Sequence, residues 1–126
     1  MSEAIVYISH FKIKEGNFES WVQHTQKATE QLKANKPGTV AFLQFTNQDQ
    51  TELSIIHVFP DAQSFDRHVE GAAERAKSAF EFLEPTGREV YGKPSEQVLS
   101  MLRPPEGSSI AFQYKPEPTG GFLRLT

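Results

Sequence analysis

The side chains best suited to acid–base chemistry near neutral pH are the four histidines. His68 falls in an apolar helical pattern between Phe65 and Ala72, so its imidazole is predicted to face the interior. A neutral imidazole in such a place can accept a proton from a phenolic ligand. The alternative is a half-buried histidine that bonds to a backbone carbonyl and has only a structural role. The pattern leaves both interpretations open.

Two further histidines, His10 and His57, lie in predicted strands. Strand alternation makes either one a candidate for a cavity or an interface, and we take His57 as a candidate substrate-binding residue. A metal site built from His10, His57 and His68 is an alternative, but no closely spaced pair of ligands supports it. We therefore predict neither a metal nor a cofactor. His24 falls on the polar side of the first predicted helix and is expected to be solvated.

Aromatic and basic side chains are the next candidates. Tyr7, Trp21 and Phe65 are predicted to shape a pocket and to stack on an aromatic ligand. A plain core role is the alternative, and it is favoured for Trp21. Arg88 and Arg124 are the basic groups expected nearest the sheet. Arg124 follows two glycines that allow close backbone approach, so it is a candidate for binding a substrate carboxylate, with a surface ion pair as the alternative.

Composition narrows the classes of function. The chain has 126 residues, no cysteine, and a net charge of −3 from 13 basic and 16 acidic side chains. The lack of cysteine excludes disulfides, thiol nucleophiles and cysteine-bound metals. Mild acidity argues against nucleic acid or an anionic membrane as a partner. The sequence has neither a signal-peptide pattern nor an apolar run of membrane-spanning length, so we expect a cytoplasmic protein.

Hydrophobic periodicity predicts the order β-α-β-β-α-β over residues 4–92. This order is that of ferredoxin-like α+β folds, with an antiparallel sheet and both helices on one face. The second strand is apolar on both faces, which predicts that the open face of the sheet pairs with a second copy in a homodimer. The expected strands are Ile5–Ile13, Thr39–Thr46, Glu52–Phe59 and Arg88–Tyr91, and the expected helices run from an Asn17 cap to Asn35 and from an Asp61 cap to Leu83.

The chain is expected to divide into a unit of residues 1–93 and a C-terminal extension of residues 94–126. In the extension, Ser95 follows Pro94 at the start of a predicted short helix. Ser109–Tyr114 is a predicted strand, and Phe122–Leu125 is a candidate for another. Two placements remain open, because the extension can pack on its own subunit or on the dimer partner.

Residues 4–92 contain three distinctive segments, KIKEGNFESWV, PGTVAF and FPDAQSFDRHVEGAA. Together they resemble the antibiotic biosynthesis monooxygenase family. The resemblance implies a ferredoxin-like monomer whose sheets pair into a dimeric α+β barrel. It also implies oxidation of phenols or quinols by molecular oxygen without a cofactor, with His68 as the functional histidine after Asp61 and Phe65. Family members commonly carry a second histidine a few residues later, where this chain has Ala72, Ala73 and Glu74.

A haem-degrading branch of the same superfamily uses Asn, Trp and His where this chain has Ser9, His68 and Ser78, so haem chemistry of that kind is not expected. Two functions remain. One is a cofactor-independent monooxygenase acting on a small aromatic phenol or quinol, with His68 as proton acceptor. The other is a non-catalytic dimeric barrel that binds a small apolar ligand or a protein partner. A cavity of several hundred Å³ reaching His68 favours the enzyme, whereas a filled core favours the binding protein.

Overall fold

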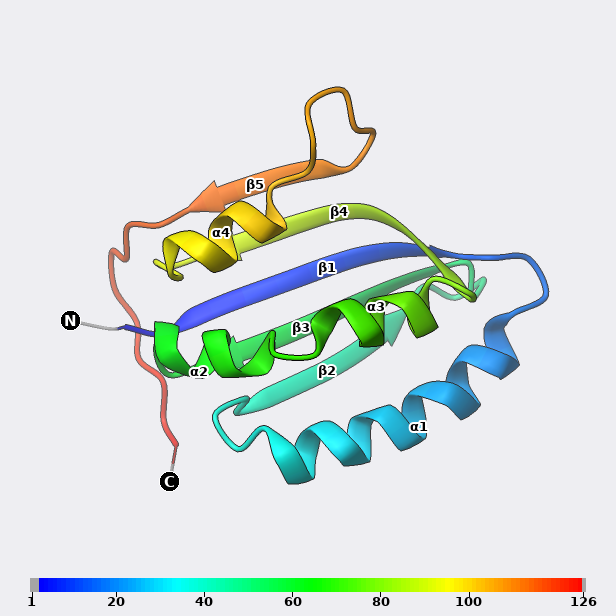
Figure 1. Cartoon of the computed structure of the whole chain (residues 1–126), viewed down its shortest axis with the longest axis horizontal. Coiled ribbons are helices and arrows are strands. Elements are labelled where there is room, and N and C mark those ends of the chain that lie inside the picture. The colour runs from blue at the N-terminus through cyan, green and yellow to red at the C-terminus, as the bar shows by residue number, and fades with distance from the viewer. Residues whose placement is uncertain (1–2, 126) are drawn as a thin grey trace.

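A five-stranded sheet in the order β2-β3-β1-β4-β5 forms one layer of the protein, and four helices lie on one of its faces (Figure 1). The structure is a computed structural model that describes residues 3–125. The strands are β1 (Ile5–Ile13), β2 (Ala41–Thr46), β3 (Glu52–Phe59), β4 (Leu83–Tyr91) and β5 (Ala111–Lys115). The helices are α1 (Phe18–Asn35), α2 (Ala62–His68), α3 (Ala72–Ala79) and α4 (Glu96–Leu102).

The predicted ferredoxin-like α+β fold is confirmed. Strand β1 is central and pairs antiparallel with both β3 and β4, while β2 pairs antiparallel with β3. The C-terminal extension adds β5, which runs parallel to β4. The sheet is therefore mixed rather than wholly antiparallel, because α4 and its following loop carry the chain back in a crossover before β5 begins.

The region between Asp61 and Tyr91 corrects the predicted boundaries. One continuous helix to Leu83 was expected, but the chain forms α2 and α3, separated at Gly71, whose φ of +80° favours glycine. Strand β4 starts at Leu83, not at Arg88, and includes Pro85. The register of β1 against β4 shifts beside Pro85, and a bulge of this kind tolerates a residue that has no N–H to donate.

Local capping follows the sequence in part. Asp61 and Ser95 accept a hydrogen bond from the backbone N–H three residues later, at 2.8 and 3.2 Å, and so cap α2 and α4 as residues of these types are expected to do. Asn17 holds the N-cap position of α1 but makes no side-chain cap bond. The strand considered for Phe122–Leu125 is not formed.

The core lies between the helices and the sheet in two separate clusters. One surrounds Ile5 at the start of β1, and the other surrounds Ile13 at its end. The side chains between them on the same face of β1 are Tyr7, Ser9 and Phe11, which alternate toward the helices. The candidate site lies between these two clusters, over the middle of the sheet.

The other face of the sheet has no helix over it (Figure 1). On β2 it presents Leu43 and Phe45, which are 49% and 58% exposed. Ile8 and Ile56, paired on β1 and β3, continue this apolar strip. We call the side chains on this side of the sheet the open face. Among residues 3–125, no helix is long and apolar enough to cross a membrane.

Candidate active site

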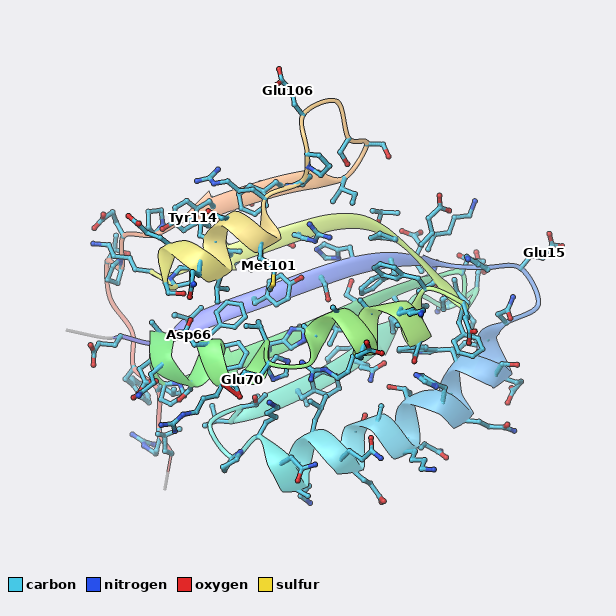
Figure 2. All side chains as sticks on the ribbon, in the orientation of Figure 1. Glu15, Asp66, Glu70, Met101, Glu106 and Tyr114 are labelled. Atoms are coloured by element: carbon cyan, nitrogen blue, oxygen red, sulfur yellow. The ribbon has the colours of Figure 1, made fainter. Side chains whose placement is uncertain are left out.

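A cavity of about 660 Å³ lies between the helices and the middle of the sheet. Its floor is formed by side chains of the central strands, including Tyr7, His57 and Arg88. Helices α1, α2 and α3 cover it, and Met101 borders it from α4, projecting toward the space above β1 (Figure 2). Most of its lining is apolar, so a ligand here is removed from water and held by a few polar groups.

His57 forms part of the floor from β3. Its Nδ1 lies 3.0 Å from the carbonyl oxygen of Tyr7, and because a carbonyl only accepts, this nitrogen carries the proton. The Nε2 atom is then the proton acceptor of the ring. Burial lowers the pKa of His57 to about 4, and the Arg75 charge contributes. The ring stacks on Tyr7, with 4.8 Å between centroids.

His68 lies at the C-terminal end of α2, with its ring centroid 5.2 Å from that of His57. Its Nδ1 is 2.7 Å from the Thr39 hydroxyl oxygen. Burial lowers the pKa of His68 to about 3, and the His57, Arg75 and Lys36 charges act in the same direction. Both imidazoles are therefore neutral at pH 7, and within residues 3–125 each forms its hydrogen bond through Nδ1 alone.

Two cations hold the backbone around the end of α2. Arg75 donates to the carbonyl oxygens of His68 and Glu70, the second at 2.9 Å. Lys36 donates to the carbonyl oxygens of Arg67 and Glu70, at 2.6 and 3.2 Å. The last carbonyls of a helix lack intrahelical partners and carry partial negative charge, which explains why cations collect there. The same cations raise the cost of protonating His68.

Tyr7 lies beside Arg88 on the floor, since β1 and β4 are neighbours. Burial raises the pKa of the Tyr7 phenol, while the Arg88 charge and hydrogen bonds from Ser9 and Arg88 act against this rise. Arg88 also donates to the carbonyl oxygen of Leu102 at 2.8 Å, which ties the end of α4 to the sheet.

The structure brings together most of the predicted site residues. Arg124 lies in the C-terminal tail, where its guanidinium stands 4.9 Å from the Phe122 ring centroid, and it is not among the residues that line this cavity. Trp21 lines the cavity and is also buried in the core, where its Nε1 donates to Gln44 at 3.2 Å. The predicted site residues that line the cavity are Tyr7, Trp21, His57, Phe65 and His68.

Two histidines differ from the sequence-based expectations. His24 is not solvated on the outer side of α1 but half-buried, 5.7 Å from Trp21 between ring centroids, and it borders the cavity. His10 lies on the open face, where it contacts Ser54 and Glu89. The three-histidine metal site is therefore not assembled, and the described part of the chain holds no cluster of ligands for a metal ion.

Sequence reasoning missed Arg75 and Thr39 as neighbours of the paired histidines. Helical spacing carries a signal for Arg75, because it follows His68 by seven residues, which is close to two turns. His68 and Arg75 lie in separate helices, α2 and α3, so the spacing within one continuous helix does not describe their contact. No local pattern points to Thr39, which contacts His68 across 29 residues of chain.

A protein-family comparison adds to this geometry. The family model described as antibiotic biosynthesis monooxygenase matches residues 4–77, which is more than half of the chain. The chain belongs to the antibiotic biosynthesis monooxygenase family. The match ends within α3, so it does not cover β4 or the C-terminal extension.

Solved structures with this family fold include a protein that also matches the extension. MupZ from Pseudomonas fluorescens is 21% identical, with a TM-score of 0.75 over 98% of this chain and 91% of that one. SnoaB from Streptomyces nogalater, a cofactor-independent oxygenase, is 17% identical, with a TM-score of 0.56 over 75% of this chain and 96% of that one.

A conserved protein from Methanosarcina mazei is 15% identical, with a TM-score of 0.62 over 75% of this chain and 95% of that one. No curated protein sequence matches the chain. At these identities the likeness concerns the fold. The difference in coverage indicates that the extension has a counterpart in MupZ that the smaller relatives lack.

Proposed function

We propose that this family member is a cofactor-independent monooxygenase that oxidises a small aromatic phenol or quinol in the cavity, with His68 as the proton acceptor. The observation that carries the proposal is a cavity of about 660 Å³ lined by two neutral histidines. SnoaB, which shares the fold, is described as a cofactor-independent oxygenase. A cavity of this size beside His68 favours the enzyme over a barrel with a filled core.

The reaction begins with transfer of the phenolic proton to an imidazole nitrogen of His68. The electron-rich anion then gives electrons to oxygen, one oxygen atom bonds to a ring carbon, and the resulting peroxide takes the proton back from His68. Loss of water from that carbon leaves a quinone. For a phenol with hydrogen at the attacked carbon, one O₂ is consumed, one oxygen atom enters the product, and the other leaves as water. The substrate supplies all the electrons.

The low pKa of His68 sets the protonation state of its ring before this step. A neutral imidazole is present over the whole physiological pH range, so the acceptor is always in its competent form. Transfer of the proton within one hydrogen bond leaves the net charge of the site unchanged. The imidazolium and the substrate anion then attract each other, and Lys36, Arg75 and Arg88 at the border of the cavity add positive charge that favours the anion. Tyr7, Trp21, His57 and Phe65 border the same cavity and are the proposed substrate-binding residues.

We include in the proposal a homodimer formed through the open face and a cytoplasmic location. The open face carries exposed apolar side chains on its edge strand β2, including Leu43 and Phe45. Exposed apolar patches of this kind are typical of protein interfaces. The cavity lies on the opposite side of the sheet, so dimerisation of this kind leaves it uncovered.

Oxygen uptake by the purified protein tests the proposal. The wild-type protein is incubated with naphthols, hydroquinones and anthrones without added cofactor, and the quinone product is followed in parallel. We expect one oxygen consumed for each quinone formed, and loss of the reaction in His68→Ala. Uptake no higher than that of His68→Ala for every phenol would reject the enzyme. Tight binding of a phenol without uptake would favour the non-catalytic alternative.

A further inference from the structure

The cavity contains more positive than negative charge. Lys36, Arg75 and Arg88 border it, and Glu74 is the acidic residue in its lining. Glu74 is exposed at the surface, whereas Arg75 and Arg88 are half-buried. Charged groups that are partly removed from water require partners. The partners that each arginine already has within the protein determine whether it can also bind a ligand.

The partners of the two arginines are not carboxylates. Among residues 3–125, the ion pairs are His10–Glu89, Lys36–Glu70 and Lys93–Glu117. Arg75 donates to two backbone carbonyls at the end of α2. Arg88 donates to the carbonyl of Leu102 and hydrogen-bonds the Tyr7 phenol. A guanidinium has five N–H donors, so these two partners leave Arg88 with donors that can bind an anion.

The position of Arg88 fits such a role. Its register partner on β1 is Ser9, beside Tyr7 on the helix-covered face. His57 faces Tyr7 from the other side of β1. Neighbouring strands are about 4.8 Å apart, and His57 and Arg88 are offset by two positions along β1. This places their backbones roughly 12 Å apart across the floor. The two side chains shorten this span, so a ligand of one or two aromatic rings reaches both ends.

We propose that Arg88 binds a carboxylate of the substrate, and that the substrate class is therefore aromatic hydroxy acids with the acid and hydroxyl groups at opposite ends. This inference rests on the proposed function for the identity of the hydroxyl end. A guanidinium binds a carboxylate in a two-pronged geometry, which fixes the orientation of the ring as well as adding affinity. Orientation in turn places the hydroxyl at the His57 and His68 pair.

The test compares two ligands of the same shape that differ in charge. Binding of 6-hydroxy-2-naphthoate and of 6-hydroxy-2-naphthamide is measured by calorimetry at pH 7 without oxygen, so that turnover cannot interfere. We expect wild-type protein to bind the acid about tenfold more tightly than the amide, or better. Arg88→Gln should lose this preference with little change in amide affinity, and Arg88→Lys should keep part of it. Arg124→Gln is the matched control and should behave as wild type.

Arg88 also holds the end of α4, so a salt titration of the wild-type protein provides a test that needs no variant. Raising the salt concentration should weaken binding of the acid several-fold and leave binding of the amide unchanged. Equal affinity of the wild type for both ligands, or an intact preference in folded Arg88→Gln, would overturn the proposal.

The experiments distinguish a failure of the proposed carboxylate site from a failure of the proposed monooxygenase function. A preference for the acid that Arg88→Gln removes, without oxygen uptake on any phenol, supports the carboxylate site and rejects the enzyme. Oxygen uptake on neutral phenols, without a preference for the acid, rejects the carboxylate site and supports the enzyme.

Discussion

On the helix-covered face of the sheet, His57 and His68 line the cavity near cations, and each bonds through Nδ1. On the open face, His10 uses both ring nitrogens, bonding Ser54 at 2.7 Å through Nδ1 and Glu89 through Nε2. Tyr91 donates to the second carboxylate oxygen of Glu89. Hydrogen bonds from Tyr91 and His10 lower the pKa of that carboxylate.

The comparison indicates that the environment of a histidine, rather than its residue type, determines whether a ring nitrogen is left for a ligand. A histidine with both nitrogens occupied has no atom to offer a ligand. A buried histidine beside other positive charges stays neutral and keeps one acceptor. Each prediction below tests one side of this contrast, in order of decreasing expected effect.

Replacement of His68 by Gln should have the largest effect. We expect phenol oxidation to slow by roughly 100-fold or more, the usual contribution of a general base. The matched replacement on the open face, His10→Gln, should leave the rate within about twofold of wild type. Steady-state oxygen uptake by both variants measures the difference. Equal losses in the two variants would mean that His68 has no special role in proton transfer.

Stability should fall as the solution is acidified. The folded pKa values of His57 and His68 are about 4 and about 3, below the value of about 6.5 in an unfolded chain. As pH falls below 6.5, the unfolded chain binds protons that the folded protein does not, so unfolding becomes easier. Each histidine should remove on the order of 2 kcal/mol of stability between pH 7 and pH 5.

Urea unfolding at a fixed protein concentration measures this dependence on pH. The variant His68→Gln should show a shallower loss of stability, since one of the two proton-binding groups is gone. A pH dependence unchanged by His68→Gln would show that His68 is already charged, or unshifted, in the folded protein.

The open face should respond to a charge placed among its exposed apolar side chains on β2. Phe45→Asp is expected to weaken the proposed dimer by roughly tenfold or more, because a buried carboxylate without a partner is costly. Phe122→Asp is the control, since Phe122 is 79% exposed in the tail and away from the sheet. Light scattering over a range of concentrations measures both. A wild-type protein that is monomeric at micromolar concentration would contradict this assembly.

The smallest effect is expected at a helix cap. Asp61 accepts a hydrogen bond from the Ser64 N–H at the start of α2, and its replacement by Ala should cost about 1 kcal/mol. Because α2 carries His68, the same change should weaken ligand binding slightly while leaving the open face unaffected. Thermal unfolding and calorimetry measure the two effects. No loss of stability would show that the cap bond contributes little.

Much of this architecture was predictable from short-range patterns. Helical spacing placed His68 on the inner side of α2, and alternation grouped His57 with Leu53 and Ile55 on one face of β3. Asp61 was predictable as a cap because its side chain satisfies a nearby N–H. These features depend on residues that are close in sequence.

The remainder depended on contacts between distant residues. The break at Gly71 and the early start of β4 follow from packing and from the bulge beside Pro85, neither of which has a periodic signal. The bond between Thr39 and His68 is similarly invisible in the sequence. The two histidines on neighbouring strands, His10 and His57, could be assigned to opposite faces only once their partners were known.

The most direct test of the account is whether His68 accepts a hydrogen bond from a bound phenol. Histidine-selective nitrogen NMR of the protein at pH 7 without oxygen should show neutral rings for His57 and His68. Addition of a phenol should shift the signal of the accepting nitrogen of His68, because the phenolic hydroxyl donates to it, and should leave the His10 signals unchanged. A His68 nitrogen signal that does not move when the phenol is bound would contradict its role as proton acceptor.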